Sequence, residues 1–218
     1  RAYDFGRMGS LPYFTMQFVQ GESMCERLGS EPEWTAAASL LGRAALRLDG
    51  IHRAGFVHRD VKAANVLIDK AGRPWWIDFG IACPIHSAPF REEDELVVGT
   101  LPYLSPERVR LEMRVAHPTA DVYSLGVVLY RLLTGVLPFD GGHDAEIMLR
   151  IQYEEPRPPC EFPGRDVPRS ISDVALQAMA KRPEERYQTA WDFAAAVGDV
   201  LMPIAAERIS GQPQILAA

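Results

Sequence analysis

Two short motifs in the first half of the chain carry side chains that could take part in a chemical reaction. The first reads His-Arg-Asp-Val-Lys-Ala-Ala-Asn at 58–65, and the second, Asp-Phe-Gly, begins thirteen residues after Asn65. In the first motif, Asp60 can accept a proton and Lys62 carries a positive charge. Asn65 and Asp78 offer oxygen atoms of the kind that Mg²⁺ prefers. Each residue alone could be a surface ion pair or a turn residue, but their joint order favours a reactive site.

The two motifs resemble H-R-D-x-K-x-x-N and D-F-G of the protein kinase family, at the spacing that the family uses. The resemblance continues in order in Gly-Thr-Leu-Pro-Tyr-Leu-Ser-Pro-Glu at 99–107, Asp-Val-Tyr-Ser-Leu-Gly at 121–126, and Arg186. Several independent motifs in the correct order are far more specific than one tripeptide. The resemblance therefore implies a kinase-like fold and ATP-dependent phosphoryl transfer.

The resemblance also implies a role for each motif residue. Asp60 would orient the acceptor hydroxyl and take its proton, while Lys62 would reach the γ-phosphate. Asn65 and Asp78 would hold Mg²⁺, a cation that few protein groups bind together with the phosphates themselves. ATP and Mg²⁺ are the implied cofactors.

Two residues indicate the kind of substrate. Lysine two residues after the catalytic aspartate, here Lys62, is the pattern of serine/threonine kinases. Thr100 matches the threonine that hydrogen-bonds the aspartate and the lysine in those enzymes. The 99–107 segment is usually lacking in small-molecule kinases of this fold, so we expect a protein substrate with a Ser or Thr acceptor.

Five residues are expected to form the adenine pocket: Met16, Gln17, Val19, Met24 and Leu67. If the strand expected at 11–19 leads into the hinge between lobes, Met16 occupies the gatekeeper position. Backbone groups of Gln17 and Val19 would then pair with adenine in an apolar slot. Ordinary core packing explains Met16, Met24 and Leu67 equally well from periodicity alone.

Several other motif residues have a structural interpretation. In the resemblance, Glu107 and Arg186 form a buried ion pair that ties the end of the activation segment to the helical core. Asp121 would anchor the backbone of the catalytic loop. His58 and Phe79 would pack beneath it. The alternative for the charged residues is that they are ordinary surface charges.

The elements that position these residues follow from periodicity and caps. A capping signature at Ser30 and Glu33 precedes a helix that we expect to stop near Gly55. We expect a β-hairpin at 66–69 and 74–77, a loop over 78–107, and helices at 119–134, 145–153, 171–180 and 189–201. The predicted fold class is α+β and mostly helical, a kinase-like C-terminal lobe with one small β-hairpin.

The N-terminal lobe is expected to be largely absent. Only ten residues precede Leu11, of which 6–10 are expected to form a turn, and they contain no Gly-rich loop and no lysine. We expect the end of the small lobe and the hinge at 1–20, the large lobe at 21–202 and a tail at 203–218. The chain is then either part of an active kinase or a non-catalytic binding or scaffold module. In both cases we expect these residues alone to be inactive, with the missing lobe as partner.

Composition limits the remaining possibilities. The chain has 218 residues and a net charge of −6, which argues against binding nucleic acid through its phosphates. Its three cysteines show no metal-ligand spacing. No apolar stretch approaches the roughly 20 residues that span a bilayer. We expect a cytoplasmic protein, or the cytoplasmic part of a longer membrane-anchored one.

A regulatory anion is also expected near Arg59, which precedes the catalytic aspartate. Ser87, after phosphorylation, or the acidic run at 92–95 would supply it. The alternative is that the four acidic side chains are simply solvated.

Overall fold

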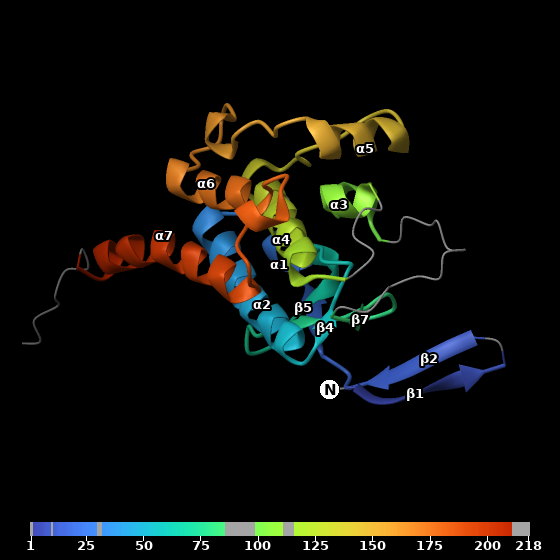
Figure 1. Ribbon diagram of the computed structural model, residues 1–218. Helices are drawn as coiled ribbons and strands as arrows, with labels where there is room; N and C mark the ends of the chain where they lie inside the picture. The colour runs from blue at the N-terminus through green and yellow to red at the C-terminus, as the bar shows by residue number, and fades with distance from the viewer. Residues whose placement is uncertain (1, 10, 30–31, 86–98, 111–115, 211–218) are drawn as a thin grey trace, which may run out of the picture.

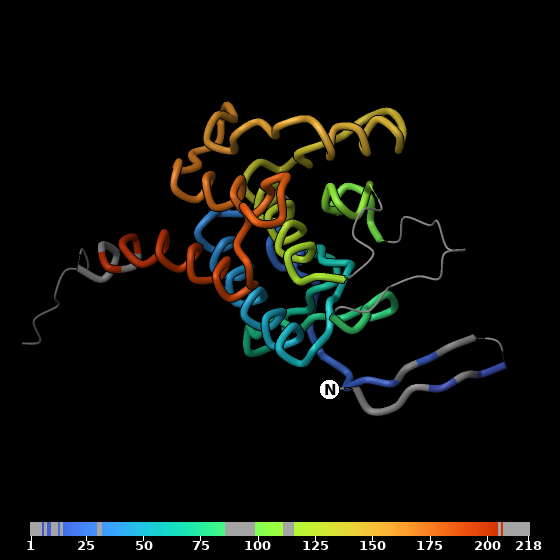
Figure 2. Tube along the Cα trace, viewed as in Figure 1, coloured from blue at the N-terminus to red at the C-terminus, as the bar shows by residue number. Residues whose placement is uncertain are grey.

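The computed structural model describes residues 2–9, 11–29, 32–85, 99–110 and 116–210 (Figures 1 and 2). Its α-helices are α1 (Met24–Leu28), α2 (Trp34–Arg53), α3 (Pro106–Val109), α4 (Pro118–Thr134), α5 (Asp144–Tyr153), α6 (Arg169–Ala178) and α7 (Ala190–Ser210). Its strands are β1 (Ala2–Met8), β2 (Leu11–Met16), β3 (Gly21–Ser23), β4 (Phe56–Val57), β5 (Val66–Asp69), β6 (Pro74–Trp76) and β7 (Cys83–Pro84). Short 3₁₀ turns are η1 (Ala63–Asn65), η2 (Leu101–Tyr103), η3 (Pro159–Glu161) and η4 (Pro183–Glu185).

Helix α4 runs through the middle of the helical part, with α2 and α6 packed against it (Figure 1). Apolar side chains cover most of its circumference, which is typical of a fully buried helix. It ends at Gly135, which adopts the left-handed conformation (φ 81°) that glycine tolerates without steric cost. The helix predicted at 119–134 is thus confirmed.

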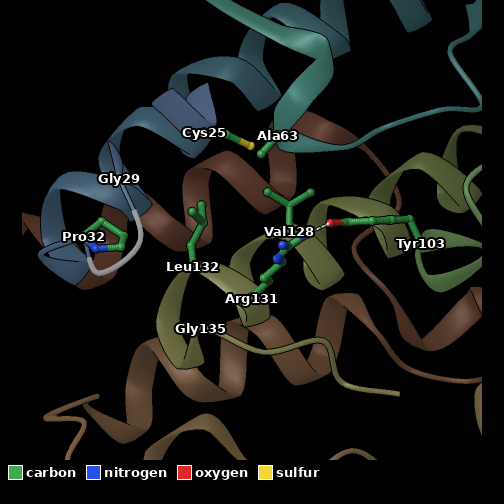
Figure 3. Close-up of a pocket in the computed structure, with 9 residues that line it drawn as sticks. All are labelled: Cys25, Gly29, Pro32, Ala63, Tyr103, Val128, Arg131, Leu132 and Gly135. Atoms are coloured by element: carbon green, nitrogen blue, oxygen red, sulfur yellow. Dashed lines mark hydrogen bonds between the residues drawn. The ribbon is translucent and has the colours of Figure 1, made fainter. Parts of the chain in front are cut away.

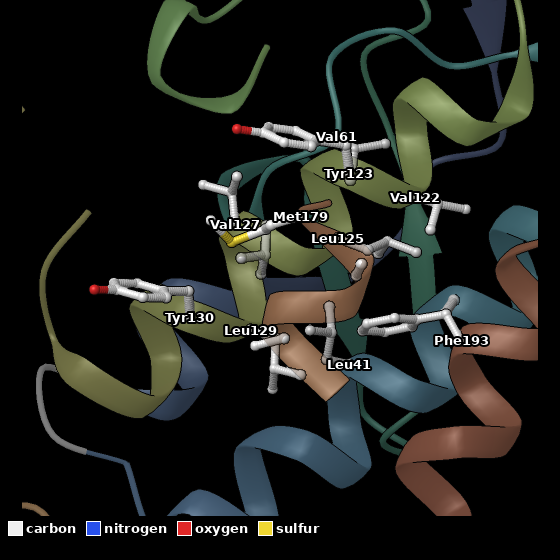
Figure 4. Close-up of a cluster of buried hydrophobic side chains, with 14 of the residues drawn as sticks. Leu41, Val61, Val122, Tyr123, Leu125, Val127, Leu129, Tyr130, Met179 and Phe193 are labelled. Atoms are coloured by element: carbon white, nitrogen blue, oxygen red, sulfur yellow. The ribbon is translucent and has the colours of Figure 1, made fainter. Parts of the chain in front are cut away.

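The main hydrophobic core lies between α4, α2 and α7. Tyr123, Leu125 and Leu129 of α4 share one buried cluster with Leu41 of α2 and Phe193 of α7 (Figure 4). All five side chains are fully buried. Val61, which lies in the 58–65 motif, belongs to the same buried cluster, so the loop is packed on this core (Figure 4).

Gly126 lies where α4 packs against α6, and we expect Gly126→Ala to destabilise the fold. A Cβ there would lie 2.8 Å from Ala178 Cβ and 2.8 Å from Met179 Cγ. Overpacking of this kind lowers the free energy of unfolding by about 1–3 kcal/mol. Urea denaturation measures it, with Gly50→Ala in α2 as the control, since a Cβ there meets nothing within 4 Å. The control should be neutral or stabilising by up to about 1 kcal/mol; equal stability of the two variants would contradict this packing.

Helix α2 begins one residue after Glu33, whose carboxylate accepts hydrogen bonds from the backbone N–H groups of Thr35 (3.2 Å) and Ala36 (3.0 Å). Glu33 is therefore the N-cap. We expected Ser30 to take part in the cap, and Ser30 lies outside the described residues. The helix ends at Arg53, close to the predicted stop at Gly55.

The predicted hairpin is confirmed as β5 and β6, with Val66 opposite Trp76. Strand β3 adds to its other edge, with Ser23 opposite Leu67. The indole N–H of Trp76 donates to the Ala44 carbonyl oxygen (2.8 Å), which fixes this sheet against α2.

The expected absence of most of the N-terminal lobe is wrong. Strands β1 and β2 pair as an antiparallel sheet, in which Met8 lies opposite Leu11. This sheet projects away from the helices (Figure 1). The fold is a mixed α+β domain with this N-terminal sheet and two further sheets, β3-β5-β6 and β4-β7, rather than one small hairpin.

Strand β1 was not predicted, because the glycines of this segment suggested a turn. Gly6 and Gly9 lie close together, yet Gly6 pairs with Tyr13 within the sheet and the positive φ (65°) occurs at Gly9, beyond the strand. Glycine has no side chain, so it fits a strand position where a neighbouring group packs closely as readily as it fits a turn.

The C-terminal helices agree with prediction except at one boundary. Helices α5 and α6 match the segments predicted at 145–153 and 171–180. Helix α7 continues through Pro203 to Ser210, past the predicted end at 201. Among the residues described, no helix combines the length and apolarity that crossing a membrane requires.

Candidate active site

Asp60 is the centre of a hydrogen-bonded cluster drawn from two separate segments. Lys62 Nζ lies 2.7 Å from Asp60 Oδ2 and also donates to Thr100 Oγ1 (2.8 Å). The Thr100 hydroxyl in turn donates to Asp60 Oδ1 (2.8 Å), and the Asn65 amide donates to Asp60 Oδ2 (2.8 Å). Thr100 comes from the segment that leads into η2, 40 residues from Asp60 in sequence. The structure therefore brings together four of the residues that the motifs singled out.

The cluster keeps Asp60 ionised. Burial alone would raise the pKa of this carboxyl, but the hydrogen bonds from Lys62, Thr100 and Asn65 outweigh it and hold the pKa below its usual value. The side chain keeps 11% of its surface exposed. Asp60 is thus a fixed, negatively charged acceptor that a hydroxyl group can still approach.

Asn65 and Asp78 are positioned by the β5–β6 hairpin. The Ile77 N–H donates to the Asn65 carbonyl oxygen (2.9 Å), which places the residue before Asp78 beside Asn65. The Asn65 amide nitrogen donates to Asp60, to its carbonyl oxygen (2.9 Å) as well as to its carboxylate, so the side-chain oxygen of Asn65 can serve as a ligand. Asp78 is exposed, and among the described residues its carboxylate accepts one long hydrogen bond, from the Gly80 N–H (3.4 Å).

Two non-glycine residues of the described chain have positive φ, and both flank the cluster: Arg59 (70°) and Asp78 (62°). Such conformations cost about 1–3 kcal/mol and persist where the surroundings fix them, often at functional sites. The Arg108 guanidinium donates to the Arg59 carbonyl oxygen (2.7 Å) and so helps to hold Arg59 in this conformation. Burial, followed by the charge of Arg59, lowers the pKa of Arg108 to about 10.

Asp121 anchors the catalytic loop from α4, as predicted. Its carboxylate accepts the backbone N–H groups of His58 (2.8 Å) and Arg59 (2.9 Å). Burial alone would raise the pKa of Asp121. Hydrogen bonds and nearby charges, of which the hydrogen bond from His52 is the largest, outweigh burial and lower the pKa. The loop backbone is therefore held by an ionised side chain in the core.

Sequence reasoning missed His52 and Arg108. His52 Nε2 lies 2.9 Å from Asp121 Oδ2, and its side chain is almost fully buried in the last turn of α2. A single histidine has no spacing signature. The only available signal was that a buried aspartate needs several donors.

His58 and Phe79 pack beneath the loop, as predicted. Their ring centroids lie 4.9 Å apart, and Trp76 lies on the other side of His58 at 5.2 Å. His58 Nε2 pairs with the Ile77 carbonyl oxygen (3.0 Å), so this nitrogen carries the proton. Burial lowers the pKa of His58, which keeps the ring neutral.

Glu107 and Arg186 form a buried ion pair with two parallel hydrogen bonds, of 2.8 and 2.7 Å. The Arg186 side chain has 0% exposure and that of Glu107 has 4%. Arg186 also donates to the carbonyl oxygens of Ala180 (2.7 Å) and Thr119 (3.1 Å). The predicted tie between α3 and the helical core is thus confirmed.

The residues expected around adenine lie on four segments. Met16 ends β2, Gln17 and Val19 lie between β2 and β3, Met24 begins α1, and Leu67 lies in β5. Met24 directly follows β3, in which Ser23 lies opposite Leu67 of β5. Since α1 also contacts β5, Met24 lies close to Leu67. Met24 is fully buried, whereas Leu67 is half-buried and Gln17 is exposed.

Acidification should unfold the protein because its key carboxylates have lowered pKa values. Asp60, Glu107 and Asp121 are all shifted down, so they stabilise the fold above the unfolded-state pKa of about 4 and lose this contribution as pH falls through their folded pKa values. His58, also lowered, acts in the same direction below about pH 6.5. Urea denaturation should show that the free energy of unfolding falls between pH 7 and pH 3. The fall should be smaller in Glu107→Gln, because this variant lacks the Glu107 carboxylate. Equal stability at both ends of that range would contradict these pKa directions.

Comparison with known proteins identifies the class. A sequence model described as protein kinase domain matches residues 1–193. The chain belongs to the protein kinase family. The match begins at residue 1 and so includes the β1–β2 sheet, which is the second reason why the expected absence of the N-terminal lobe is wrong.

The relatives are bacterial serine/threonine-protein kinases. The chain is 38% identical over 195 residues to the "Probable serine/threonine-protein kinase PknB" of Corynebacterium glutamicum, covering 87% of the chain and 30% of that protein. It is 36% identical over 200 residues to the serine/threonine-protein kinase PknB of Mycobacterium leprae, covering 88% and 32%. The corresponding protein of Mycobacterium tuberculosis is 37% identical over 200 residues, with the same coverage. The chain thus spans about a third of the length of these relatives.

Proposed function

We propose that this protein transfers the γ-phosphoryl group of ATP to serine or threonine hydroxyls of protein substrates. The observation that carries the proposal is the cluster in which Lys62 and Thr100 both hydrogen-bond the carboxylate of Asp60. A threonine and a lysine on that aspartate are the serine/threonine-kinase pattern. The relatives' names support the same substrate class.

Phosphoryl transfer requires positioning and charge neutralisation more than covalent chemistry by the protein. Asp60 accepts the hydrogen bond of the substrate hydroxyl and thereby aims its oxygen. Its lowered pKa makes it a weak base, so it takes the proton late, when the oxygen has become acidic through bonding to phosphorus. Lys62 supplies positive charge near the transferred group, and Thr100 fixes both side chains relative to each other.

Asn65 and Asp78 fit Mg²⁺ in their chemistry. Both present oxygen atoms, and the amide of Asn65 is oriented by its bonds to Asp60. The described residues contain no cluster of three or more His, Cys, Asp or Glu side chains suited to a metal. A pair of oxygen ligands is sufficient for a cation that also binds phosphates. When bound, Mg²⁺ would neutralise phosphate charge at this site.

The adenine pocket and the domain limits are part of the same proposal. Met16, Gln17 and Val19 would border adenine from the segment after β2, and Met24 and Leu67 from the β3–β5 side. The division at 1–20, 21–202 and 203–218 would place this pocket at the junction of the two lobes. The placement of Met24 and Leu67 supports the proposal, since β3 pairs with β5 and α1 contacts β5.

The decisive test is an assay of the protein expressed from its complete gene, because the chain spans only part of its relatives. Incubation with Mg²⁺, γ-labelled ATP and casein should place label on serine or threonine, as phosphoamino-acid analysis would show. Thermal shift should show a rise in melting temperature with ATP only when Mg²⁺ is present. No label and no Mg²⁺-dependent shift would instead favour the non-catalytic binding module.

A further inference from the structure

A cavity of about 230 Å³ lies between α1, α4 and η2, outside the cluster around Asp60 (Figure 3). Its walls include Ala63, Tyr103, Val128, Arg131 and Leu132. Pockets for small-molecule ligands are usually about 300–1,000 Å³. This cavity is smaller and suits one or two side chains rather than a nucleotide.

The cavity borders both segments that build the candidate active site. Ala63 directly follows Lys62, and Tyr103 is tied to Thr100 by a backbone hydrogen bond of 2.9 Å. A polypeptide whose hydroxyl reaches Asp60 therefore passes within a few residues of this cavity. That location favours the substrate chain as its occupant.

Among the described residues that line the cavity, Arg131 is the one charged group and none is a carboxylate. Its guanidinium donates to the Tyr103 hydroxyl oxygen (2.7 Å), which directs the group along the cavity wall (Figure 3). The bond to Tyr103 raises the pKa of Arg131, so it stays charged.

Arg131 differs from several other arginines on the surface of the described residues. Four others have carboxylate partners at 2.6–2.8 Å: Arg27, Arg53, Arg73 and Arg150. Among the ion pairs of the described residues, none includes Arg131. An arginine that is oriented by a phenol, beside apolar walls and without a carboxylate, is suited to bind an anionic group from another molecule.

We propose that this cavity is a substrate subsite in which an acidic side chain close to the acceptor Ser or Thr pairs with Arg131. An apolar neighbour of that acidic residue packs against Val128 and Leu132. The inference rests on the proposed kinase function and adds a preference for acidic sequences. Charge complementarity of this kind discriminates between partners more than it raises affinity in general.

The test compares peptides that each contain one serine and differ at a single nearby position, which is Glu, Gln or Arg. With the wild-type protein we expect kcat/KM for the best Glu peptide to exceed that for its Gln counterpart by about fivefold or more. Arg131→Glu should reverse the order and favour the Arg peptide. The control is Arg169→Glu, an arginine 85% exposed in α6 and away from the cavity, which should keep the wild-type order.

A binding measurement separates this inference from the proposed function. The Asp60→Asn variant should bind the Glu peptide more tightly than the Gln peptide in fluorescence anisotropy, although it transfers phosphate about 10³-fold more slowly. Phosphorylation without a Glu preference would overturn the subsite and leave the kinase function intact. Equal binding of the two peptides, or a Glu preference that survives Arg131→Glu, would overturn the subsite as well. A Glu preference in binding with no transfer by the wild-type protein would support the subsite and overturn the proposed activity.

Discussion

Replacing Asp60 by asparagine is expected to lower kcat for peptide phosphorylation by about 10³-fold, within the range that general acid–base residues contribute. The asparagine amide keeps the size of the side chain but removes the charge that aims the acceptor hydroxyl and receives its proton. Lys62 Nζ and the Thr100 hydroxyl also lose the carboxylate that they bind at 2.7 and 2.8 Å. The KM for ATP should change much less, because Asp60 is assigned to the acceptor and not to the nucleotide.

The control for this substitution is Asp173→Asn. Asp173 is an exposed aspartate of α6, 58% accessible, whose pairing with Arg169 is long at 3.7 Å. Its replacement should leave kcat unchanged. Circular dichroism of both variants checks that the fold is retained. If Asp60→Asn keeps more than about a tenth of wild-type kcat, Asp60 is not the residue that handles the acceptor proton.

The residues around Asp60 could be found from sequence because phosphoryl transfer restricts both residue type and spacing. An aspartate, a lysine two residues later and an asparagine three residues after that leave few alternatives. Thr100 is 40 residues away, but it lies in a motif of its own. The long helices were also predictable, since α4 buries nearly its whole surface and has apolar residues around most of its circumference.

Other features depend on tertiary contacts that leave no local pattern. His52 gains its role only where the end of α2 meets Asp121, and Arg108 only where α3 meets the backbone of Arg59. Strand β1 was missed because glycine fits both a turn and a strand. Arg131 interrupts an apolar helix, and its orientation along a cavity depends on Tyr103 from another segment.

The second large effect concerns the buried ion pair, and Arg186→Met is expected to lower the free energy of unfolding by about 3–5 kcal/mol. Methionine fills much of the same space but leaves the Glu107 carboxylate buried without its partner. It also removes the donors that Arg186 supplies to the carbonyl oxygens of Ala180 and Thr119. Urea denaturation at pH 7 measures the loss. Arg182→Met is the matched control, because its pair with Glu184 is 68% and 60% exposed and its loss should leave the free energy of unfolding nearly unchanged.

The pH dependence of the Arg186→Met variant distinguishes a buried charge from a simple packing defect. In the wild-type protein Arg186 overcomes the effect of burial and keeps the pKa of Glu107 below its usual value. Without Arg186, burial dominates and the folded-state pKa of Glu107 rises above that of the unfolded chain. Protonation then stabilises the folded variant, so its deficit relative to wild type should shrink between pH 7 and pH 5. A deficit that stays constant over this range would mean that lost packing, rather than the unpaired Glu107 carboxylate, causes the destabilisation.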